Sequence, residues 1–284
     1  MYLFKQKDTL DRHLAAARNN GKRIGFVPTM GALHPGHLSL IAKAKEHCDQ
    51  VVCSIFVNPT QFNDPADFEK YPVTIDNDIL QLTDAGTDVL FLPSVSEMYP
   101  EGLGSKTHYD FGQLETILEG AHRPGHFQGV GQVVHKLLDL VKPDALFMGQ
   151  KDFQQCLIVN LLLKLIHSTT ELVICPTLRE SDGLAMSSRN MRLNAVERQN
   201  ALNIYKALCY VKDNIHKASF SEILSNAVNQ LTTNGFDVDY IELVSIEADG
   251  SVSFPKGPGT NPLYAVVAAK ELSSGVRLID NMHI

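Results

Sequence analysis

Residues 25–41 read GFVPTMGALHPGHLSLI, and this stretch decides the predicted fold class. Its start belongs to an apolar run, residues 23–28, that predicts a buried β-strand. A Gly-rich turn follows, and residues 36–48 then repeat apolar side chains three and four positions apart, as one face of a helix does. A second apolar run at 50–57 predicts another strand. A strand, a helix and a strand in this order indicate two parallel neighbours in one sheet.

The same alternation continues to about residue 175. The sequence predicts further strands at 88–92, 144–148 and 171–175, and further helices at 74–85, 129–141 and 153–166. These strands are apolar throughout, which is typical of a parallel sheet covered by helices on both faces. We therefore predict an α/β fold with a doubly wound, Rossmann-like parallel sheet.

The pattern changes after Pro176. Two helical patterns, at 195–216 and 219–234, precede three strand-like runs at 239–247, 263–269 and 276–280. Helices followed by a group of strands indicate a smaller α+β unit. We place the boundary between Cys175 and Ser181, which predicts a Rossmann-like domain at 1–177 and an α+β lid domain at 178–284.

Composition excludes several classes of function. The net charge is −7 and no Lys/Arg run occurs, which argues against nucleic acid as a partner. No apolar stretch approaches the roughly 18 residues of a membrane span, and the N-terminus is charged where a signal peptide has an apolar core. The five cysteines form no CxxC pair and are typical of reduced thiols. We expect a cytoplasmic protein.

The turn between the first strand and its helix is the first candidate site. Ligands of open parallel sheets bind beyond the carboxyl ends of the strands, and a helix N-terminus favours phosphate. His34 and His37 could be zinc ligands, buried structural residues or phosphate contacts. The stretch lacks the third ligand of a zinc motif such as HExxH, which disfavours zinc. Their place in a strand-to-helix turn favours phosphate contacts over a structural role.

Two further loops carry cations. Lys151 follows the 144–148 strand beside a glycine, where it could neutralise phosphate, although alone it could equally be a surface lysine. The loop at 177–190 contains Ser187, Ser188 and Arg189, and alone it could be an ordinary loop. Several such residues at loops that this fold gathers together favour a phosphate-bearing ligand.

Carboxamides supply a second kind of group. Gln61 follows the 50–57 strand, and Gln155 lies just beyond Lys151. An uncharged amide that donates and accepts hydrogen bonds suits the hydroxyl or carboxylate of a small polar substrate. Arg123 and His126, in a loop before a predicted helix, could also face this site.

At these residues the chain resembles known families. HPGH at 34–37 resembles the HxGH signature of nucleotidyltransferases related to class I aminoacyl-tRNA synthetases, and MSSR at 186–189 resembles their mobile ATP-contacting motif. From near residue 23 to the C-terminus, the sequence is similar to the pantothenate synthetase family in five longer strings: PTMGALHPGHLSLI, SIFVNPTQF, EGAHRPGHFQGV, FMGQKDFQQ and DGLAMSSRN.

The resemblance implies a reaction and its ligands. It implies an ATP-dependent ligase that condenses (R)-pantoate with β-alanine to pantothenate through a pantoyl-adenylate intermediate, with release of AMP and pyrophosphate. It also implies a requirement for Mg²⁺ and a homodimer.

Carried over motif by motif, the resemblance also implies the site residues. Catalytic roles fall on His34, His37, Lys151, Ser187, Ser188 and Arg189, with His37 as the assigned acid. Gln61 would contact pantoate and β-alanine, and Gln155 pantoate. The ATP contacts would be Pro28, Thr29, Met30, Gly31, Ala32, Leu33, His34, Pro35, Gly36, His37, Gly149, Gln150, Lys151, Asp152, Leu178, Met186, Ser187, Ser188 and Arg189.

Two positions depart from the family pattern. The family often has Glu at the position of Gln150 and Val at that of Leu178. Contacts made through backbone atoms would survive both changes. The missing charge at Gln150 puts in doubt any role of that side chain in holding Mg²⁺.

Two other functions stay open. An HxGH transferase that adenylylates a phosphate-bearing acceptor would need additional cations for that acceptor, whereas Gln61 and Gln155 suit an uncharged or carboxylate group. A nucleotide-binding regulatory module without turnover is the second alternative, and the intact His34, His37, Lys151 and Arg189 argue against it.

Overall fold

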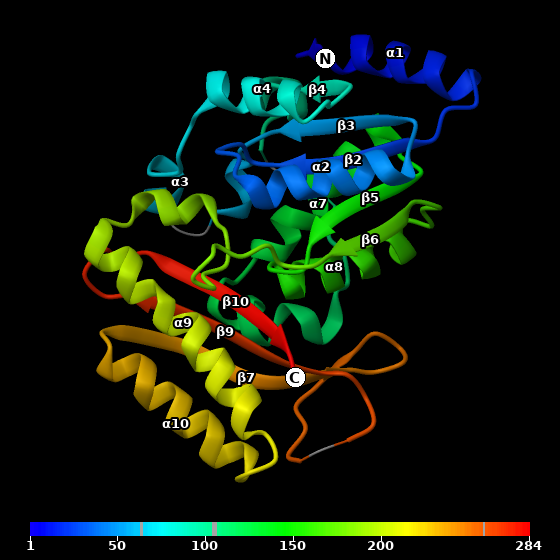
Figure 1. Ribbon diagram of the computed structural model, residues 1–284. Helices are drawn as coiled ribbons and strands as arrows, with labels where there is room; N and C mark the ends of the chain where they lie inside the picture. The colour runs from blue at the N-terminus through cyan, green and yellow to red at the C-terminus, as the bar shows by residue number, and fades with distance from the viewer. Residues whose placement is uncertain (63–64, 104–106, 258) are drawn as a thin grey trace. The chain divides into compact units, whose positions relative to one another are not determined.

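The computed structural model describes residues 1–62, 65–103, 107–257 and 259–284 (Figure 1). By its packing the chain divides into two compact units. The first consists of residues 1–111, 123–149 and 155–176, and the second of residues 112–122, 150–154 and 177–284. The second unit thus includes two short segments from the first half of the chain.

The first unit contains a six-stranded sheet in which every neighbouring pair is parallel. The strand order is β1-β4-β3-β2-β5-β6. This confirms the predicted doubly wound parallel sheet. The strands are β1 (Tyr2–Phe4), β2 (Ile24–Thr29), β3 (Gln50–Ile55), β4 (Val89–Phe91), β5 (Ala145–Gly149) and β6 (Glu171–Cys175).

The strand order defines the place where such a sheet binds ligands. From β2 the chain adds β3 and then β4 on one side, whereas β5 and β6 lie on the other side of β2. The order therefore reverses between β2 and β5, where Gly25 pairs with Ala145 and Phe26 with Leu146. Ligands of open α/β sheets bind beyond the carboxyl ends at such a switch point. Here those ends are Thr29 and Gly149.

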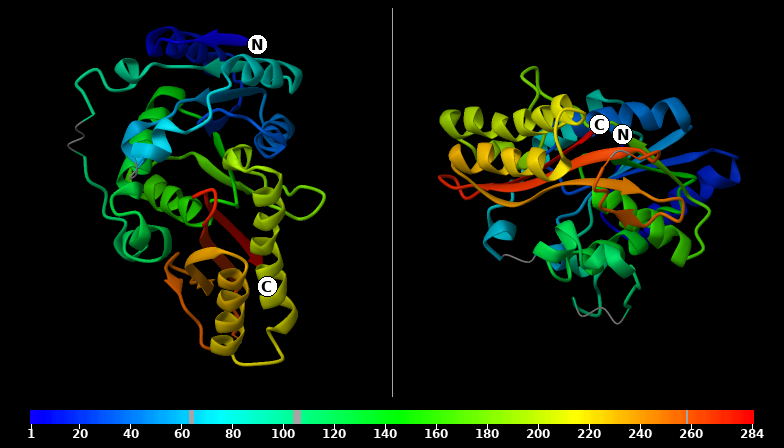
Figure 2. Two further views of the ribbon diagram at one scale, coloured as in Figure 1. Left: turned by 90° about the vertical axis from the view of Figure 1, so that its left-hand side faces the viewer. Right: turned by 90° about the horizontal axis from the view of Figure 1, so that it is seen from below.

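Helices cover both faces of this sheet, with α2 on one side and α7 on the other (Figures 1 and 2). Leu40, Ile41 and Ala44 of α2 pack on buried strand residues, as their spacing predicts. The helices of or entering this unit are α1 (Lys7–Asn19), α2 (Pro35–His47), α3 (Pro65–Glu69), α4 (Ile75–Asp84), α5 (Val95–Met98), α7 (His126–Val141) and α8 (Phe153–Leu165), with the 3₁₀ helix η1 (Pro59–Gln61).

The second unit contains an antiparallel sheet of order β10-β9-β7-β8, and α9 and α10 pack together against it (Figure 2). Apolar residues of both helices, such as Leu208 and Ile223, form one core with Ile241 and Val267 of the strands. This confirms the predicted α+β character. The elements are α6 (Leu118–His122), α9 (Ala195–Asn214), α10 (Phe220–Thr233), β7 (Phe236–Ile246), β8 (Val252–Ser253), β9 (Leu263–Glu271) and β10 (Arg277–His283), with 3₁₀ helices η2 (Gly112–Glu115) and η3 (Ser188–Arg192).

A buried ionic cluster explains why residues 112–122 belong to the second unit. Glu119 is 7% exposed, and its carboxylate accepts two hydrogen bonds from Arg277, at 2.6 and 2.8 Å. The same arginine donates to Asp239 at 2.6 Å, and the Tyr240 hydroxyl donates to Glu119 at 2.8 Å. Burial, together with the Glu119 charge, raises the pKa of Tyr240, so this hydroxyl keeps its proton.

All five cysteines are free thiols. Cys53, Cys156 and Cys175 are buried, and Cys48 and Cys209 are partly exposed. Burial raises the pKa of Cys53 to about 12, which keeps this thiol protonated and unreactive. Among the helices of the described residues, none combines the length and apolarity needed to cross a membrane.

Candidate active site

The turn that follows β2 is held in one conformation by its own backbone. Gly31 has φ = +79°, a left-handed conformation that favours glycine. A Cβ at this position would lie 3.0 Å from Ile55 Cγ2 and 3.1 Å from an oxygen of Asp78. The Thr29 hydroxyl accepts from the Gly31 N–H at 3.2 Å and donates to the Ser54 carbonyl at 2.8 Å. The conformation of this turn therefore depends on both Gly31 and Thr29.

Asp78 on α4 anchors the same turn, a role that the sequence analysis missed. Its side chain is fully buried, and its two oxygens accept from the backbone N–H of Ala32 at 3.0 Å and of Leu33 at 2.8 Å. The Thr74 hydroxyl also donates to it at 3.0 Å. The available signal was a carboxylate on the apolar face of a predicted helix, since a buried charge needs partners.

We predict that Asp78→Ala lowers the free energy of unfolding by about 2–4 kcal/mol, because it leaves two buried N–H groups without acceptors at roughly 1–3 kcal/mol each. Urea unfolding measures this loss. Asp76→Ala, at an exposed position of the same helix, is the matched control. Equal stabilities of the two variants would show that Asp78 does not anchor the turn.

His34 and His37 lie together at the start of α2. Their ring centroids are 4.0 Å apart, and the His34 carbonyl accepts from the His37 N–H at 2.8 Å. The His34 backbone N–H in turn donates to Nδ1 of His37 at 3.4 Å. Because Nδ1 accepts, the neutral His37 ring carries its proton on Nε2, where it can donate to a ligand.

Gln61 lies beside this turn in the first unit. It ends η1, directly after β3, and its side-chain amide donates to the sulfur of Met30 at 2.7 Å. Met30 belongs to the turn that leads to the two histidines. The first unit therefore brings Gln61, a predicted substrate-binding residue, into contact with the turn that is predicted to bind ATP.

Asn58 fixes the loop that carries Gln61. It is 1% exposed, accepts from the Tyr99 hydroxyl at 2.9 Å and donates to the Gly129 carbonyl at 3.2 Å. Gly129 is needed for this packing, because a Cβ there would lie 2.3 Å from the Thr60 carbonyl oxygen. The close approach of α7 to η1 thus sets the position of the Gln61 backbone.

Arg123 and His126 also contact the backbone of Gln61. The Gln61 carbonyl oxygen lies 2.7 Å from Nδ1 of His126 and 3.3 Å from Nη2 of Arg123. Nε2 of His126 lies 3.1 Å from the Arg123 guanidinium. The structure therefore gives both residues a supporting role under Gln61.

In the second unit, Lys151 and the loop before α9 hold the remaining candidate residues. The Lys151 side chain is 16% exposed, and its Nζ lies 3.6 Å from Asp152. Ser187 precedes η3, and its hydroxyl accepts from the Arg189 N–H at 3.3 Å. Ser188 is buried. The Met186 N–H donates to the Leu178 carbonyl at 3.1 Å, which ties the two ends of the loop together.

The two neighbouring carboxamides at the start of α8 differ in role. Gln154 is buried, donates to the carbonyls of Leu114 and Ile117 at 2.7 and 3.0 Å, and accepts from the Glu119 N–H at 2.9 Å. Within the described parts of the chain, the partly exposed Gln155 side chain forms no hydrogen bond. Gln154 is therefore structural, and Gln155 is the one with free donor and acceptor atoms.

The candidate residues thus form two groups, one in each unit. The first unit holds the residue 28–37 turn, Gln61, Gly149 and Gln155, and the second holds residues 150–152, Leu178 and residues 186–189. A doubly wound parallel sheet with the residue 28–37 turn beyond β2, beside the strand-order switch, defines an α/β protein with a ligand site expected at this edge of the sheet.

Comparison with known proteins gives the family. The family model described as pantoate-beta-alanine ligase matches residues 2–283. The chain therefore belongs to the pantoate-β-alanine ligase family.

Individual relatives are similar over nearly their whole length. The pantothenate synthetase of Cytophaga hutchinsonii is 44% identical over 275 residues, which cover 96% of this chain and 95% of the relative. The pantoate–β-alanine ligase of Schizosaccharomyces pombe is 40% identical over 284 residues, which cover 99% and 98%.

Solved structures agree as well. Pantothenate synthetase from Thermus thermophilus is 37% identical and superposes with a TM-score of 0.90 over 99% of both chains. Pantoate-β-alanine ligase from Francisella tularensis, solved in complex with β-γ ATP and β-alanine, is 36% identical, with a TM-score of 0.82 over 100% of this chain and 97% of that one.

Proposed function

We propose that this chain condenses (R)-pantoate with β-alanine to pantothenate, with ATP cleaved to AMP and pyrophosphate. The observation that carries the proposal is the contact between Gln61 and Met30. It places the Gln61 side-chain amide, which we assign to substrate binding, beside the HxGH turn. The family match over residues 2–283 and the ligands of the Francisella relative support the same reaction.

The proposed chemistry needs two steps because a carboxylate does not react with an amine in water. The carboxylate oxygen of pantoate attacks the α-phosphorus of ATP, and the bond to pyrophosphate breaks. The β-alanine amine then attacks the carbonyl of the pantoyl adenylate, and AMP leaves. No protein nucleophile is needed for either step.

The protein's task is to stabilise charge. Negative charge grows on the phosphoryl oxygens during the first step, and fixed donors lower its energy. We assign this role to Lys151, Arg189, the N-terminus of α2 and Nε2 of His37, with His34 beside it. The ATP contacts proposed are residues 28–37, residues 149–152, Leu178 and residues 186–189.

We propose that Mg²⁺ enters as a complex with ATP. In nucleotide enzymes this ion is held by phosphates, waters and one or two carboxylates. Asp152, whose carboxylate lies 3.6 Å from Lys151 Nζ, is the motif residue whose chemistry fits such a contact. Among the described residues, no group of three His, Cys, Asp or Glu side chains is placed to hold a metal ion.

Three further proposals rest on the family resemblance. The second domain, with the loop at 187–189, closes over the adenylate and keeps water from it. The chain forms a homodimer and works in the cytoplasm. Light scattering of the purified protein tests the dimer, and fractionation of the cells that produce it tests the location.

The direct test is incubation with ATP, Mg²⁺, pantoate and β-alanine, with mass detection of products. We expect pantothenate and AMP in equal amounts. A stable adenylylated product would instead support a transferase acting on another acceptor. ATP binding by calorimetry without pyrophosphate release would support a regulatory module.

We predict that Gln61→Ala raises the KM for both pantoate and β-alanine by about 10-fold or more, since a hydrogen bond to a charged group contributes roughly 1.5–3 kcal/mol. The KM for ATP should change little. Gln132→Ala is the matched control, because its amide donates to the Thr107 carbonyl, at 3.1 Å, and is not assigned to the site. A selective loss of ATP binding in Gln61→Ala would contradict the assignment.

A further inference from the structure

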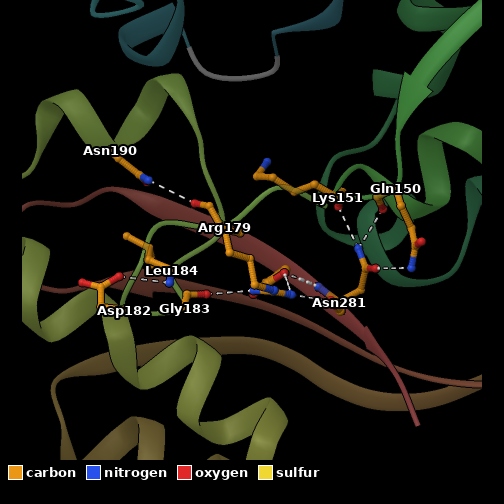
Figure 3. A network of polar contacts seen from close by, with 10 residues as sticks. Gln150, Lys151, Arg179, Asp182, Gly183, Leu184, Asn190 and Asn281 are labelled. Atoms are coloured by element: carbon orange, nitrogen blue, oxygen red, sulfur yellow. Dashed lines mark hydrogen bonds and ion pairs between the residues drawn. The ribbon is translucent and has the colours of Figure 1, made fainter. Parts of the chain in front are cut away.

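Three residues of the second unit form a polar network that no motif assigned (Figure 3). Asp280 and Asn281 are neighbours on β10, and they are 4% and 2% exposed. Arg179 lies in the loop between β6 and η3. Asn281 contacts the backbone of the loop that carries Lys151, and Arg179, which pairs with Asp280, contacts the backbone of the 178–189 loop.

Asn281 holds the loop of Lys151. Its amide nitrogen donates to the carbonyl oxygens of Gln150 at 2.8 Å and Lys151 at 3.0 Å. Its amide oxygen accepts from the Gln150 side chain at 3.2 Å. One buried carboxamide therefore uses both its nitrogen and its oxygen to fix residues 150 and 151 to β10, as Figure 3 shows.

Arg179 holds the second loop to the same strand. It forms a two-point ion pair with Asp280, at 2.6 and 3.0 Å. It also donates to the Gly183 carbonyl at 3.0 Å and to the Asn281 carbonyl at 2.9 Å. The guanidinium lies over the Tyr205 ring, 4.9 Å from its centroid. The Arg179 guanidinium is therefore occupied by contacts within the protein, and its role in this loop is structural.

Stability alone is a weak explanation for this network. Burial raises the pKa of Asp280 in spite of Arg179, because the ionised carboxylate loses its hydration. A buried ion pair often adds no more stability than apolar residues of similar volume. What it does provide is a defined geometry, because a guanidinium and a carboxylate pair in one plane.

We propose that Asn281 and the ion pair of Arg179 with Asp280 are positioning residues for adenylation, which hold Lys151 and the 178–189 loop in one arrangement on β10. This inference rests on the proposed function. Its physical basis is that catalytic donors must be fixed before charge develops, and a misplacement of about 1 Å can cost as much as 10²-fold in rate.

The first experiment measures pantoyl-adenylate formation in single turnovers, normalised to active sites. Asn281→Ala should slow this step by about 10-fold or more, with the KM for ATP within about 3-fold of wild type. In a Lys151→Ala background the same change should add less than about 2-fold, because residues that act through one another are not additive. Asn200→Ala is the control, since its amide donates to the Asn234 carbonyl at 2.9 Å in the same unit.

Arg179→Lys is the second variant, in case Asn281→Ala fails to fold. Lysine keeps the charge but cannot form the two-point pair and both carbonyl contacts. It should slow adenylation in the same way. For either variant, a normalised rate equal to that of Asn200→Ala, or full additivity with Lys151→Ala, would overturn the proposal.

Hydrogen exchange of the ligand-free protein separates this inference from the proposed function. Asn281→Ala and Arg179→Lys should each raise amide exchange at both residues 150–155 and residues 178–190, and Asn200→Ala should not. Unchanged exchange in both segments would overturn the coupling whatever the reaction is. Failure of the wild-type protein to form an adenylate would instead remove the proposed function.

Discussion

Replacing Lys151 with alanine slows pantoyl-adenylate formation by about 10² or more, a loss of about 2.7 kcal/mol of transition-state stabilisation. The reason is that Lys151 supplies a fixed positive charge where the phosphoryl oxygens gain negative charge. Its side chain is 16% exposed, and Asn281 holds its backbone carbonyl. Pantoate-dependent exchange between ATP and pyrophosphate measures this half-reaction alone.

The control for this prediction is Lys43→Ala. Lys43 pairs with Glu46 on the surface of α2 and is not assigned to the site. It should leave exchange unchanged, because an exposed ion pair contributes at most about 1 kcal/mol to stability. A near wild-type exchange rate for Lys151→Ala would remove Lys151 from the mechanism.

Replacing His37 with alanine should slow the same step by a similar factor, about 10². At the N-terminus of α2 its Nε2 carries the proton that can be donated to a phosphate, because Nδ1 accepts from the His34 backbone. A second substitution distinguishes hydrogen bonding by His37 from proton transfer by His37. His37→Gln keeps an N–H donor, so it restores part of the rate if hydrogen bonding is enough, and none of it if His37 must transfer a proton.

His47→Ala is the control for the histidine prediction. His47 is exposed and lies at the other end of α2, so its loss tests for a general effect on the helix. It should retain the wild-type exchange rate. If His37→Ala and His47→Ala behave alike, the assignment of His37 to catalysis is wrong.

Much of the fold could be predicted because burial leaves a periodic pattern. The strand expected at 50–57 is β3, and the helix expected at 129–141 is the larger part of α7. Short or mostly polar elements were not predicted. β1 has only three residues at a sheet edge, and α1 is polar except for a narrow buried face of Leu10, Leu14 and Ala17. No sequence pattern indicates that residues 112–122 pack with the second unit.

The candidate site was predictable to the extent that its residues stand in local motifs. HPGH and MSSR are contiguous, so a resemblance can assign them. Residues that act by binding distant backbone leave no such motif. Asp78 binds Ala32 from 46 positions away, and Asn281 binds Lys151 from 130 positions away. Contacts of this kind depend on the folded chain, which no short sequence pattern contains.

The central proposal is that residues 28–37 and Lys151 bind the phosphates of the same ATP molecule. A crystal structure of the protein with ATP and pantoate tests it most directly. We predict that His34, His37 and Lys151 all lie within hydrogen-bonding distance of the phosphates of the same nucleotide, with Gln61 on the pantoate. A nucleotide that contacts residues 28–37 but leaves Lys151 out of reach would contradict the claim.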